Sequence, residues 1–545
     1  MQKTSSPTIS HTDGEKITLS PYAQALIQKV ASIAKRSIAP DASLISVSQT
    51  VSFFAIMYEK VRNAVEFREE HLVRRAAIER ILKRRLMLNP DGQGAGENLI
   101  RELLWARYLP NTSITETDVI HIQSTIDKYL YLKKQVVEGR DTPSKILYTQ
   151  FIRDLLTSEI EEELAHENAQ KKAAFLYFIY QVLKEKVSIR NVSDEQKDIF
   201  FYIACESGFA KNDLAFIRYH LFKLSRKTVG KCEKHELETL VTTFPELVTG
   251  IERVIKNPFH VKLVKFVRKQ VPPFSILFTI INRYPRLIYA ILGKKDELWK
   301  KVDIICREKY KETGAKLKRA AVRSIIYIFL TKMIFVLLLE YPLTRYVYHE
   351  TDIWPLAVNT FFPPILMALF ISFVTVPSEK NTKNIFARIL DILNRDPSFE
   401  TTKTLVTNKT RTKRPLLLFG FTIFYLCTFG VTFALIYLLL DYLRFNLISK
   451  AIFMFFLTVI TFFAFRIVQT TKEYTLEEKE NILAPLADFF FMPILSVGKF
   501  VSSGIAKINI FILIFDFLIE APFKMIFEIV EEWINFVKAR KEDII

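Results

Sequence analysis

Four long apolar runs within about 150 residues constrain this chain more than any other feature of its sequence. The hydrocarbon layer of a bilayer is about 30 Å thick, and an α-helix needs about 20 residues to cross it. A buried helix of a soluble protein can be as apolar, but four such runs so close together make that alternative weak. The sequence therefore predicts an integral membrane protein whose transmembrane helices cover residues 324–343, 353–376, 415–440 and 448–468.

The charges on the connecting segments predict which helix ends share a side. Short loops rich in Lys and Arg stay on the cytoplasmic side of a membrane. Residues 344–352 and 441–447 carry one such residue each, whereas residues 377–414 carry nine. This asymmetry predicts a multi-pass protein of the plasma (inner) membrane with a cytoplasmic N-terminus and a cytoplasmic loop at 377–414. The opening residues also lack the apolar stretch of a signal peptide.

A basic segment precedes the first apolar run. The formal net charge is +18, and residues 251–320 hold 18 Lys and Arg against 6 Asp and Glu. Cations beside a span each gain about 1 kcal/mol against an anionic leaflet, so we expect anionic lipid, not nucleic acid, as the counter-charge. The pattern predicts basic juxtamembrane amphipathic helices that lie on the bilayer, and a core helix with a solvated basic face is the alternative. The residues expected to contact anionic lipid are Lys262, Lys265, Arg268, Lys269, Arg283, Arg286, Lys316, Lys318 and Arg319.

The remaining segments complete an all-α fold. Only 14 Gly and 21 Pro punctuate the chain, so helix is expected throughout. Residues 1–20 are polar and are expected to be disordered, and residues 21–250 are expected to form a helical cytoplasmic domain. The transmembrane region covers 321–470. Charged residues recur through 471–545, which predicts interfacial helices there, with a spanning segment at 504–527 as the alternative.

Several helix starts carry cap signals. Ser20 precedes Pro21, which is the arrangement of an N-cap followed by proline in the first turn. Thr142 and Pro143 repeat this arrangement, and Ser193 opens a capping-box sequence. These signals predict helices that begin near residues 21, 142 and 193.

Two ionisable residues lie inside the first apolar run. Lys332 is the ninth of its twenty residues, and Glu340 follows eight positions later. Intramembrane charge is costly and normally faces the bundle interior or water. The two residues are about 12 Å apart along a helix axis, so we expect no direct pair between them. Asn359, in the second run, is the third intramembrane polar candidate.

The expected depth of these side chains suggests their partners. The candidates are Asn359, Tyr425 and Thr428 for Lys332, and Asp441, Arg444 and Lys450 for Glu340. An equally weighted alternative is a shifted span, in which Lys332 extends to the interface. Pro363 and Pro364 remove two hydrogen-bond donors from the second run and predict a kink there.

No motif specifies a reaction. The glycine-rich stretch at 92–96 follows a helix and lacks the Lys-Ser/Thr of a phosphate-binding loop, so we interpret it as a connector. Cys232 and His235 have the spacing of metal ligands, but no second pair nearby completes a zinc site. We assign no catalytic, cofactor-binding or metal-binding residue, expect no cofactor, and favour a protein that is not an enzyme.

Two charged clusters in the cytoplasmic domain have competing interpretations. A basic helix end fits a solvated face, an anionic-lipid contact or a docking surface for an acidic partner, in that order of preference. Its members are Arg74, Arg75, Arg80, Lys83, Arg84 and Arg85. The glutamates between 159 and 167 are interpreted as a solvated face, because consecutive positions point around a helix.

The distribution of mass favours a membrane-anchored scaffold. Most of the chain is expected to be cytoplasmic, so the leading hypothesis is a non-enzymatic protein that binds a cytoplasmic protein partner or organises the bilayer. The first alternative is a transporter or channel subunit, assembled as a homo-oligomer because four helices alone line little, that uses Lys332, Asn359 and the Pro363-Pro364 break. The second alternative is a lipid-acting membrane enzyme.

Overall fold

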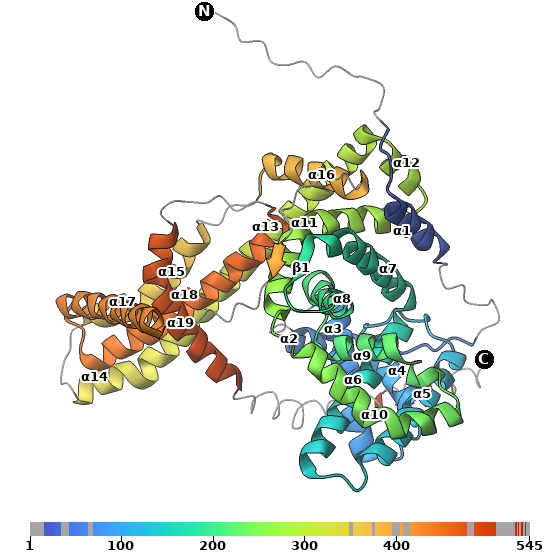
Figure 1. The fold of residues 1–545 in the computed structure, drawn as a ribbon. Helices are drawn as coiled ribbons and strands as arrows, with labels where there is room; N and C mark the ends of the chain where they lie inside the picture. Colours follow the sequence, from blue (N-terminus) through green and yellow to red (C-terminus); the bar gives the residue numbers. More distant parts are fainter. Residues whose placement is uncertain are drawn as a thin grey trace, which may run out of the picture. The chain divides into compact units, whose positions relative to one another are not determined.

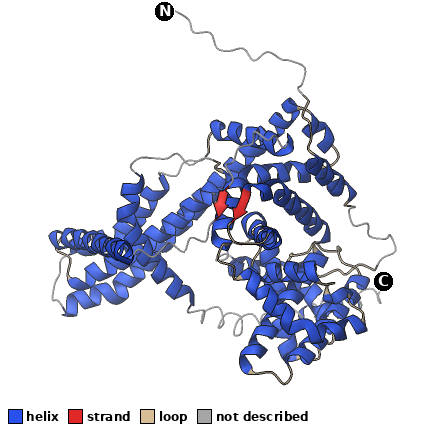
Figure 2. Ribbon diagram, in the orientation of Figure 1, coloured by secondary structure: helices blue, strands red, loops and turns tan. Residues whose placement is uncertain are grey.

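The computed structural model describes residues 16–33, 43–63, 69–347, 353–372, 377–394, 404–406, 415–476 and 484–507, with seven residues between 529 and 540. This part of the chain is helical except for two three-residue strands and the connections (Figures 1 and 2). The prediction of an all-α fold is therefore confirmed. Most of the segment expected to be disordered, residues 1–15, lies outside the described residues.

Contacts divide the chain into two compact units. The N-terminal unit comprises Leu19–Lys269, Pro397–Asn408 and Ile514–Ile545. The span unit comprises Met1–Thr18, Gln270–Asp396 and Lys409–Leu513. Each unit is described by itself below.

The N-terminal unit is a stack of helices, and one apolar core joins buried residues of α2 to α6 and α8 to α10. Its helices are α1 (Pro21–Ser32), α2 (Gln49–Asn63), α3 (Glu70–Leu88), α4 (Ala95–Trp105), α5 (Glu116–Val137), α6 (Thr142–Leu164), α7 (His166–Leu183), α8 (Asp194–Cys205), α9 (Leu214–Ser225), α10 (Lys234–Ile255) and the first part of α11 (His260–Arg283). Short turns η1 (Lys184–Lys186), η2 (Glu206–Ala210) and η3 (Val229–Lys231) connect them, and β1 (Val187–Ile189) pairs in parallel with β2 (Thr404–Val406). Helix α6 packs against α3, α5 and α9, so it lies at the centre of the unit.

The caps explain where several of these helices begin. Ser20 accepts a hydrogen bond from the backbone N–H of Ala23 at 3.3 Å, and Ser193 accepts one from Gln196 at 3.3 Å. An unbonded N–H of the first turn gains a partner in each case. At α6 the cap differs by one position from the prediction, because Asp141 is the N-cap and Thr142 is the first helical residue.

Helix α6 continues through the acidic stretch that was expected to be a solvated face. Glu159 and Glu161 are buried, and Glu162 and Glu163 are only partly exposed. The interpretation as a solvated face is wrong for this part of the stretch. The helical periodicity predicted that most of these glutamates face solvent. That prediction fails because α6 has neighbours on several sides, so more than one of its faces is covered.

The span unit contains the apolar helices. Its elements are the remainder of α11, α12 (Ile288–Gly293), α13 (Lys295–Phe335), η4 (Val336–Glu340), α14 (Tyr341–Val347), α15 (Ile353–Ser372), α16 (Glu379–Asn394), α17 (Pro415–Tyr442), α18 (Leu447–Thr471), η5 (Lys472–Tyr474) and α19 (Ala484–Lys507). Among the described residues, four helical stretches are long and apolar enough to cross a membrane: Lys295–Leu343, Trp354–Ser372, Phe419–Tyr442 and Leu447–Ile467. They coincide with the four predicted runs, except that the first continues a long charged helix.

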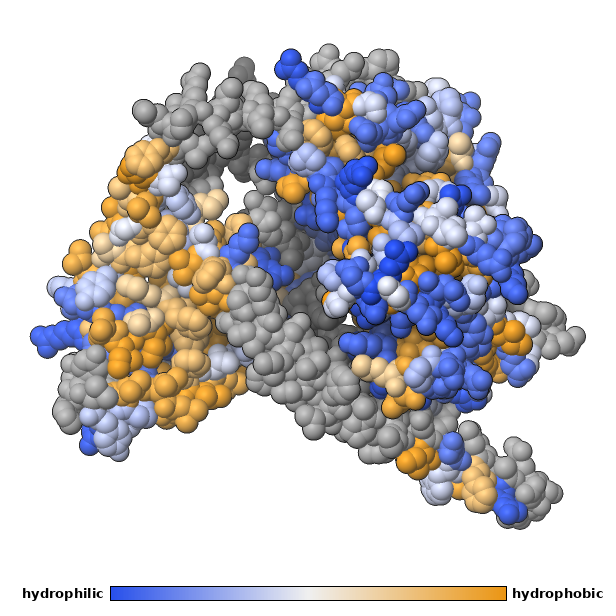
Figure 3. Space-filling view, turned by 60° about the horizontal axis from the view of Figure 1, so that its bottom comes forward, coloured by the Kyte–Doolittle hydropathy of each residue, from blue (hydrophilic) through white to orange (hydrophobic). Residues whose placement is uncertain are grey.

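These helices leave much of their apolar surface uncovered. Only 11% of the most apolar stretch of the first span is buried, and 44% of that of the fourth. In Figure 3 the surface of this bundle is largely hydrophobic, whereas the surface of the N-terminal unit is mixed and largely hydrophilic. Uncovered apolar side chains of this extent suit a lipid environment.

Helix α16 contacts both α13 and the turn after α18. It packs along the charged first part of α13, and Asn381 donates hydrogen bonds to the hydroxyl of Tyr310 at 2.7 Å and to the carbonyl of Tyr474 at 2.8 Å. Tyr310 belongs to α13 before its apolar part, and Tyr474 follows α18. The start of the first span and the end of the fourth therefore lie on the same side, as an even number of crossings requires.

Helix α19 packs directly on α18 and α17. At Gly498 the approach is so close that an added Cβ would clash with the carbonyl oxygen of Thr458 and lie 2.8 Å from Cβ of Phe462. A small residue at a helix contact permits such proximity between membrane helices. The predicted interfacial segment therefore begins with a helix attached to the bundle, and most of residues 504–527 lie outside the described part of the chain.

Candidate functional site

Three polar side chains meet inside the span unit. Lys332, Glu340 and Asn359 each have 0% exposure. The ammonium of Lys332 lies 3.3 Å from Oε2 of Glu340, and Nδ2 of Asn359 donates to Oε1 of Glu340 at 2.5 Å. The same amide lies 3.4 Å from the carbonyl of Ser449 in α18. We call these residues the intramembrane cluster.

A π-turn makes the pair between Lys332 and Glu340 possible. Their expected separation excluded a direct pair, and that expectation is wrong. Residues seven apart in an α-helix lie about 20° apart around its axis. The π-turn η4 takes up one additional residue, so the residue eight positions after Lys332 occupies this aligned place. The long lysine side chain covers the remaining distance, and its Nζ lies 4.5 Å from the ring centroid of Phe456.

Asn359 connects the cluster to the proline pair. Pro363 and Pro364 lie inside α15, which continues through both of them, and both are buried. A proline has no N–H to donate to the carbonyl four residues earlier. Pro363 therefore leaves the backbone carbonyl of Asn359 without its helical partner. The side chain of the same residue donates the hydrogen bond to Glu340.

The other expected partners lie elsewhere. Tyr425 is 45% exposed, and Thr428 donates to the carbonyl of Phe424 at 2.9 Å. Lys450 forms an ion pair with Asp441, and its Nζ lies 4.0 Å from the ring centroid of Tyr437. Only Asn359 among the suggested partners belongs to the cluster, and its partner is Glu340 and not Lys332.

The nine basic residues expected to contact anionic lipid are all exposed: Lys262, Lys265, Arg268, Lys269, Arg283, Arg286, Lys316, Lys318 and Arg319. Arg283 forms an ion pair with Glu308, and Lys316 forms one with Glu312. The apolar face of the first part of α11 is buried in the N-terminal unit, where Val267 packs against Gly208. This part of α11 is therefore a core helix with a basic face, which was the alternative interpretation.

The basic end of α3 faces the interior of the N-terminal unit. Its arginines pair with carboxylates on other elements: Arg74 with Glu161 at 2.6 Å, Arg75 with Asp213 at 2.7 Å, Arg80 with Glu59 at 2.9 Å, and Arg84 and Arg85 with Glu102 at 2.5 and 2.9 Å. None of the three interpretations predicted that the arginines pair with buried carboxylates of the same unit. Of the six basic residues, only Lys83 is exposed. A sequence of one chain does not indicate which distant glutamate faces which arginine.

A second buried network was not predicted. His220 lies between two carboxylates, with Nε2 2.7 Å from Glu162 and Nδ1 3.0 Å from Glu206. Burial alone lowers the pKa of His220, but the carboxylates of Glu206 and Glu162 outweigh burial and raise the pKa to about 10. His220 is therefore a buried cation at neutral pH. Glu206 is the first residue of the π-turn η2. Lys211, the residue directly after this turn, has φ of 55°.

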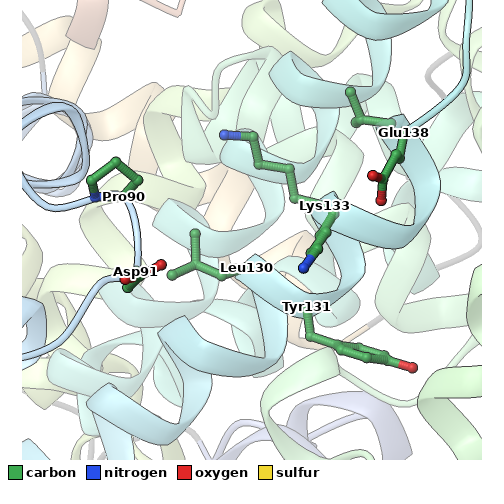
Figure 4. A pocket seen from close by; sticks show the side chains of 8 residues that line it. Pro90, Asp91, Leu130, Tyr131, Lys133 and Glu138 are labelled. Atoms are coloured by element: carbon green, nitrogen blue, oxygen red, sulfur yellow. The ribbon is translucent and has the colours of Figure 1, made fainter.

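A surface hollow of about 450 Å³ lies beside α5 in the N-terminal unit (Figure 4). Pro90 and Asp91 of the turn after α3 face Leu130 and Lys133 of α5 across it. Its polar residues are exposed and it contains no buried ionisable group, so it offers no fixed chemistry for a ligand. The glycine-rich stretch at 92–96 contributes a turn with φ of 73° at Gly92, as expected of a connector.

No group of three or more metal-ligating side chains occurs among the described residues. No known protein family, curated protein or solved structure matches the chain.

Proposed function

We propose that the protein is a membrane-anchored scaffold that holds the N-terminal unit at the cytoplasmic surface of the plasma (inner) membrane. Helix α13 carries this proposal. It is one helix of 41 residues, about 60 Å long at 1.5 Å per residue, and it joins a charged first part to the first span. Such a helix gives the span a rigid extension into the aqueous side, onto which α12 and α16 pack.

The charges within the spans support a structural role over conduction. Lys332 is neutralised by Glu340 inside the unit, where both side chains are buried. Lys450 is paired with Asp441, whose side chain is 63% exposed. Pairing of opposite charges lowers the cost of placing them in a membrane. The pair of Lys332 and Glu340 leaves no exposed charged group at the cluster for a passing solute.

Exposed cations support the proposed orientation and a lipid partner. Lys316, Lys318 and Arg319 lie on α13 shortly before its apolar part, on the side where α16 lies. We propose that they contact anionic headgroups of the cytoplasmic leaflet. Binding of the purified protein to anionic nanodisc lipids should then weaken as salt rises, because screening shortens the range of charge attraction.

The scaffold function is tested with the full-length protein. In liposomes it should produce no solute or proton flux above that of empty liposomes. In native membranes, photo-crosslinkers placed on exposed positions of the N-terminal unit, such as Ile120 and Tyr177, should give discrete adducts, and the same probes at Lys499 should not. Flux, or the same adduct pattern from all positions, would overturn the proposal.

The orientation is tested separately. Reporter fusions at residues 348 and 395 should lie on opposite faces of the membrane, with residue 395 in the cytoplasm. A cytoplasmic residue 348 would overturn the proposed topology without affecting the fold of either unit.

A transporter or channel subunit is the second candidate, and the intramembrane cluster favours it. Buried ionisable residues next to a π-turn and a proline break recur at transport sites. Under this alternative the chain forms a homo-oligomer and conducts, and Lys332→Leu reduces that flux. Flux that Lys332→Leu abolishes would replace the scaffold proposal with this one.

A further inference from the structure

The segment between α16 and α17 contributes a strand to the N-terminal unit. Residues Pro397–Asn408 belong to this unit, whereas α16 before them and α17 after them belong to the span unit. Figure 2 shows their strand β2 beside β1, with both strands in red. The two strands run parallel, and their residues form three pairs: Val187 with Thr404, Ser188 with Leu405, and Ile189 with Val406. A segment between two spans therefore pairs with a strand from a distant part of the sequence.

The local structure on both sides of β1 fixes this strand. Before it, the backbone N–H of Val187 donates to the carbonyl of Lys184 in η1. After it, Asn191 has φ of 62°, a left-handed conformation that asparagine tolerates, and the chain continues into the Ser193 cap of α8. The side chains of Val187 and Ile189 are buried, with exposures of 3% and 6%. Strand β1 is therefore held at both ends and has an apolar face.

The pairing between β1 and β2 is small. Among the described residues it forms the whole of a two-stranded sheet, with three residues from each strand. A parallel pair is slightly less stable per residue than an antiparallel pair, and even a two-stranded hairpin is marginal in water by itself. Residues 404–406 therefore stay on β1 chiefly because the chain keeps them close to it, and a matching segment of another molecule can replace them.

The edge of β1 that residues 404–406 occupy requires a partner of a particular kind. Buried backbone N–H and C=O groups are nearly always hydrogen-bonded, and β2 supplies these bonds along this edge. Any replacement must be an extended chain, because a helix has used most of its own backbone groups. The register places Thr404 and Val406 opposite buried residues of β1, so the segment that fits carries β-branched residues two positions apart.

We propose that this edge of β1 is a docking site at which the N-terminal unit takes up an extended segment of a partner protein, with residues 404–406 as the resident occupant. Peptides bind other sheets by adding a strand to an edge in the same way. The partner segment runs parallel to β1 and carries β-branched residues at alternate positions. The assignment of a partner rests on the proposed scaffold function. Its tests use a peptide and no partner, so their failure leaves the flux and crosslinking tests of the scaffold untouched.

The first test measures binding of a labelled peptide with the sequence of residues 401–409, TTKTLVTNK, to full-length protein in detergent. In the wild type, the tethered residues 404–406 compete at an effective concentration that is roughly millimolar. The variant Leu405→Pro/Val406→Pro removes this competition, because successive N–H groups of a strand point to opposite edges and one of the two must face β1. We expect this variant to bind the peptide at least about tenfold more tightly than the wild type.

Two controls define the site. Thr410→Pro/Thr412→Pro changes the same segment beyond the strand, and this variant should bind the peptide as the wild type does. A peptide with proline at the positions of Leu405 and Val406 should bind none of the proteins. Equal affinity of the wild type and Leu405→Pro/Val406→Pro for the first peptide, or no difference between the two peptides, would overturn the proposal.

A disulfide across the strand pair tests the same edge without disrupting β2. Ser188→Cys/Leu405→Cys, combined with Cys427→Ser to remove the exposed native thiol, places two thiols at paired positions. Neighbouring strands are about 4.8 Å apart, which is within the range of a disulfide. The oxidised protein should lose peptide binding, and reduction should restore it. Binding that oxidation leaves unchanged would contradict the assignment, and disulfide-linked dimers would assign the edge to a second copy of the chain in place of a partner.

Discussion

The two units bury charge in different ways. In the N-terminal unit the buried ion pairs join separate helices, such as Arg74 of α3 with Glu161 of α6 and Arg218 of α9 with Asp154 of α6. In the span unit the buried pair is formed by Lys332 and Glu340 of one helical stretch. Buried charge in the N-terminal unit therefore joins one helix to another, whereas the buried pair of the span unit joins two positions of one helical stretch.

The difference follows from the surroundings. A helix of the N-terminal unit gains stability from any neighbour that covers its apolar face, so specific charge pairs select among the possible packings. A helix in lipid has no hydrophobic gain from covering its apolar face, because lipid is as apolar as a neighbouring helix. A lysine and a glutamate on the same span can neutralise each other before neighbouring helices assemble, and Asn359 then adds α15 to the completed pair.

Replacement of His220 should have the largest effect on stability. His220→Gln leaves Glu162 and Glu206 buried without their shared cation, and removal of one partner of a buried pair costs about 3–5 kcal/mol. We expect the free energy of unfolding of the N-terminal unit to fall by this amount, as measured by denaturant unfolding at pH 7. His235→Gln, at a side chain that is 75% exposed, is the matched control and should change it by less than about 0.5 kcal/mol. Similar losses for both variants would contradict a central role for His220.

The pH dependence of stability should sharpen this result. The pKa of His220 is raised in the folded state to about 10 from an ordinary value of 6.5. Its contribution to stability is therefore fully present below pH 6.5 and is lost as the pH rises toward 10. The difference in free energy of unfolding between wild type and His220→Gln should be greatest near pH 6 and should shrink toward pH 10. A difference that stays constant would show that His220 is not the group responsible.

The spans could be predicted from the sequence because the signal is local. Each apolar run is continuous and reports its own environment, so the runs at 415–440 and 448–468 needed no knowledge of their neighbours. The polarity of Lys332, Glu340 and Asn359 likewise marked them as candidates. Their connection depended on the π-turn η4, for which the sequence VLLLE carries no distinctive signal.

The network around His220 could not be predicted for a different reason. Glu162, Glu206 and His220 belong to different elements, and nothing in the sequence near any of them indicates the others. Arginines at the end of α3 were also ambiguous, because a basic cluster has the same pattern whether it meets water or buried carboxylates. Pairing of this kind depends on the tertiary fold and is not encoded in local periodicity.

Substitution in the intramembrane cluster should test the buried ion pair of the span unit. Lys332→Met leaves Glu340 as an unpaired charge, which costs about 2.5–3.5 kcal/mol inside a membrane. The double variant Lys332→Met/Glu340→Gln removes both charges and should recover most of that loss. The measurement is unfolding of the full-length protein in detergent, with Lys499→Met, at an exposed lysine of α19, as the control. A double variant no more stable than the single one would contradict mutual neutralisation.

Enlargement of Gly498 should have the smallest of these effects, because it changes packing and not charge. Gly498→Val forces side-chain atoms against the carbonyl of Thr458 and against Phe462, and overpacking of this kind typically costs about 1–3 kcal/mol. Because α19 lies on the bundle through this contact, we expect faster proteolysis of the segment after α18 while the pair between Lys332 and Glu340 persists. Gly430→Val on α17, where no atom lies within 4 Å of an added Cβ, is the matched control. If both variants are equally resistant to protease, α19 does not depend on close approach to α18, and its attachment must come from apolar side chains elsewhere along the helix.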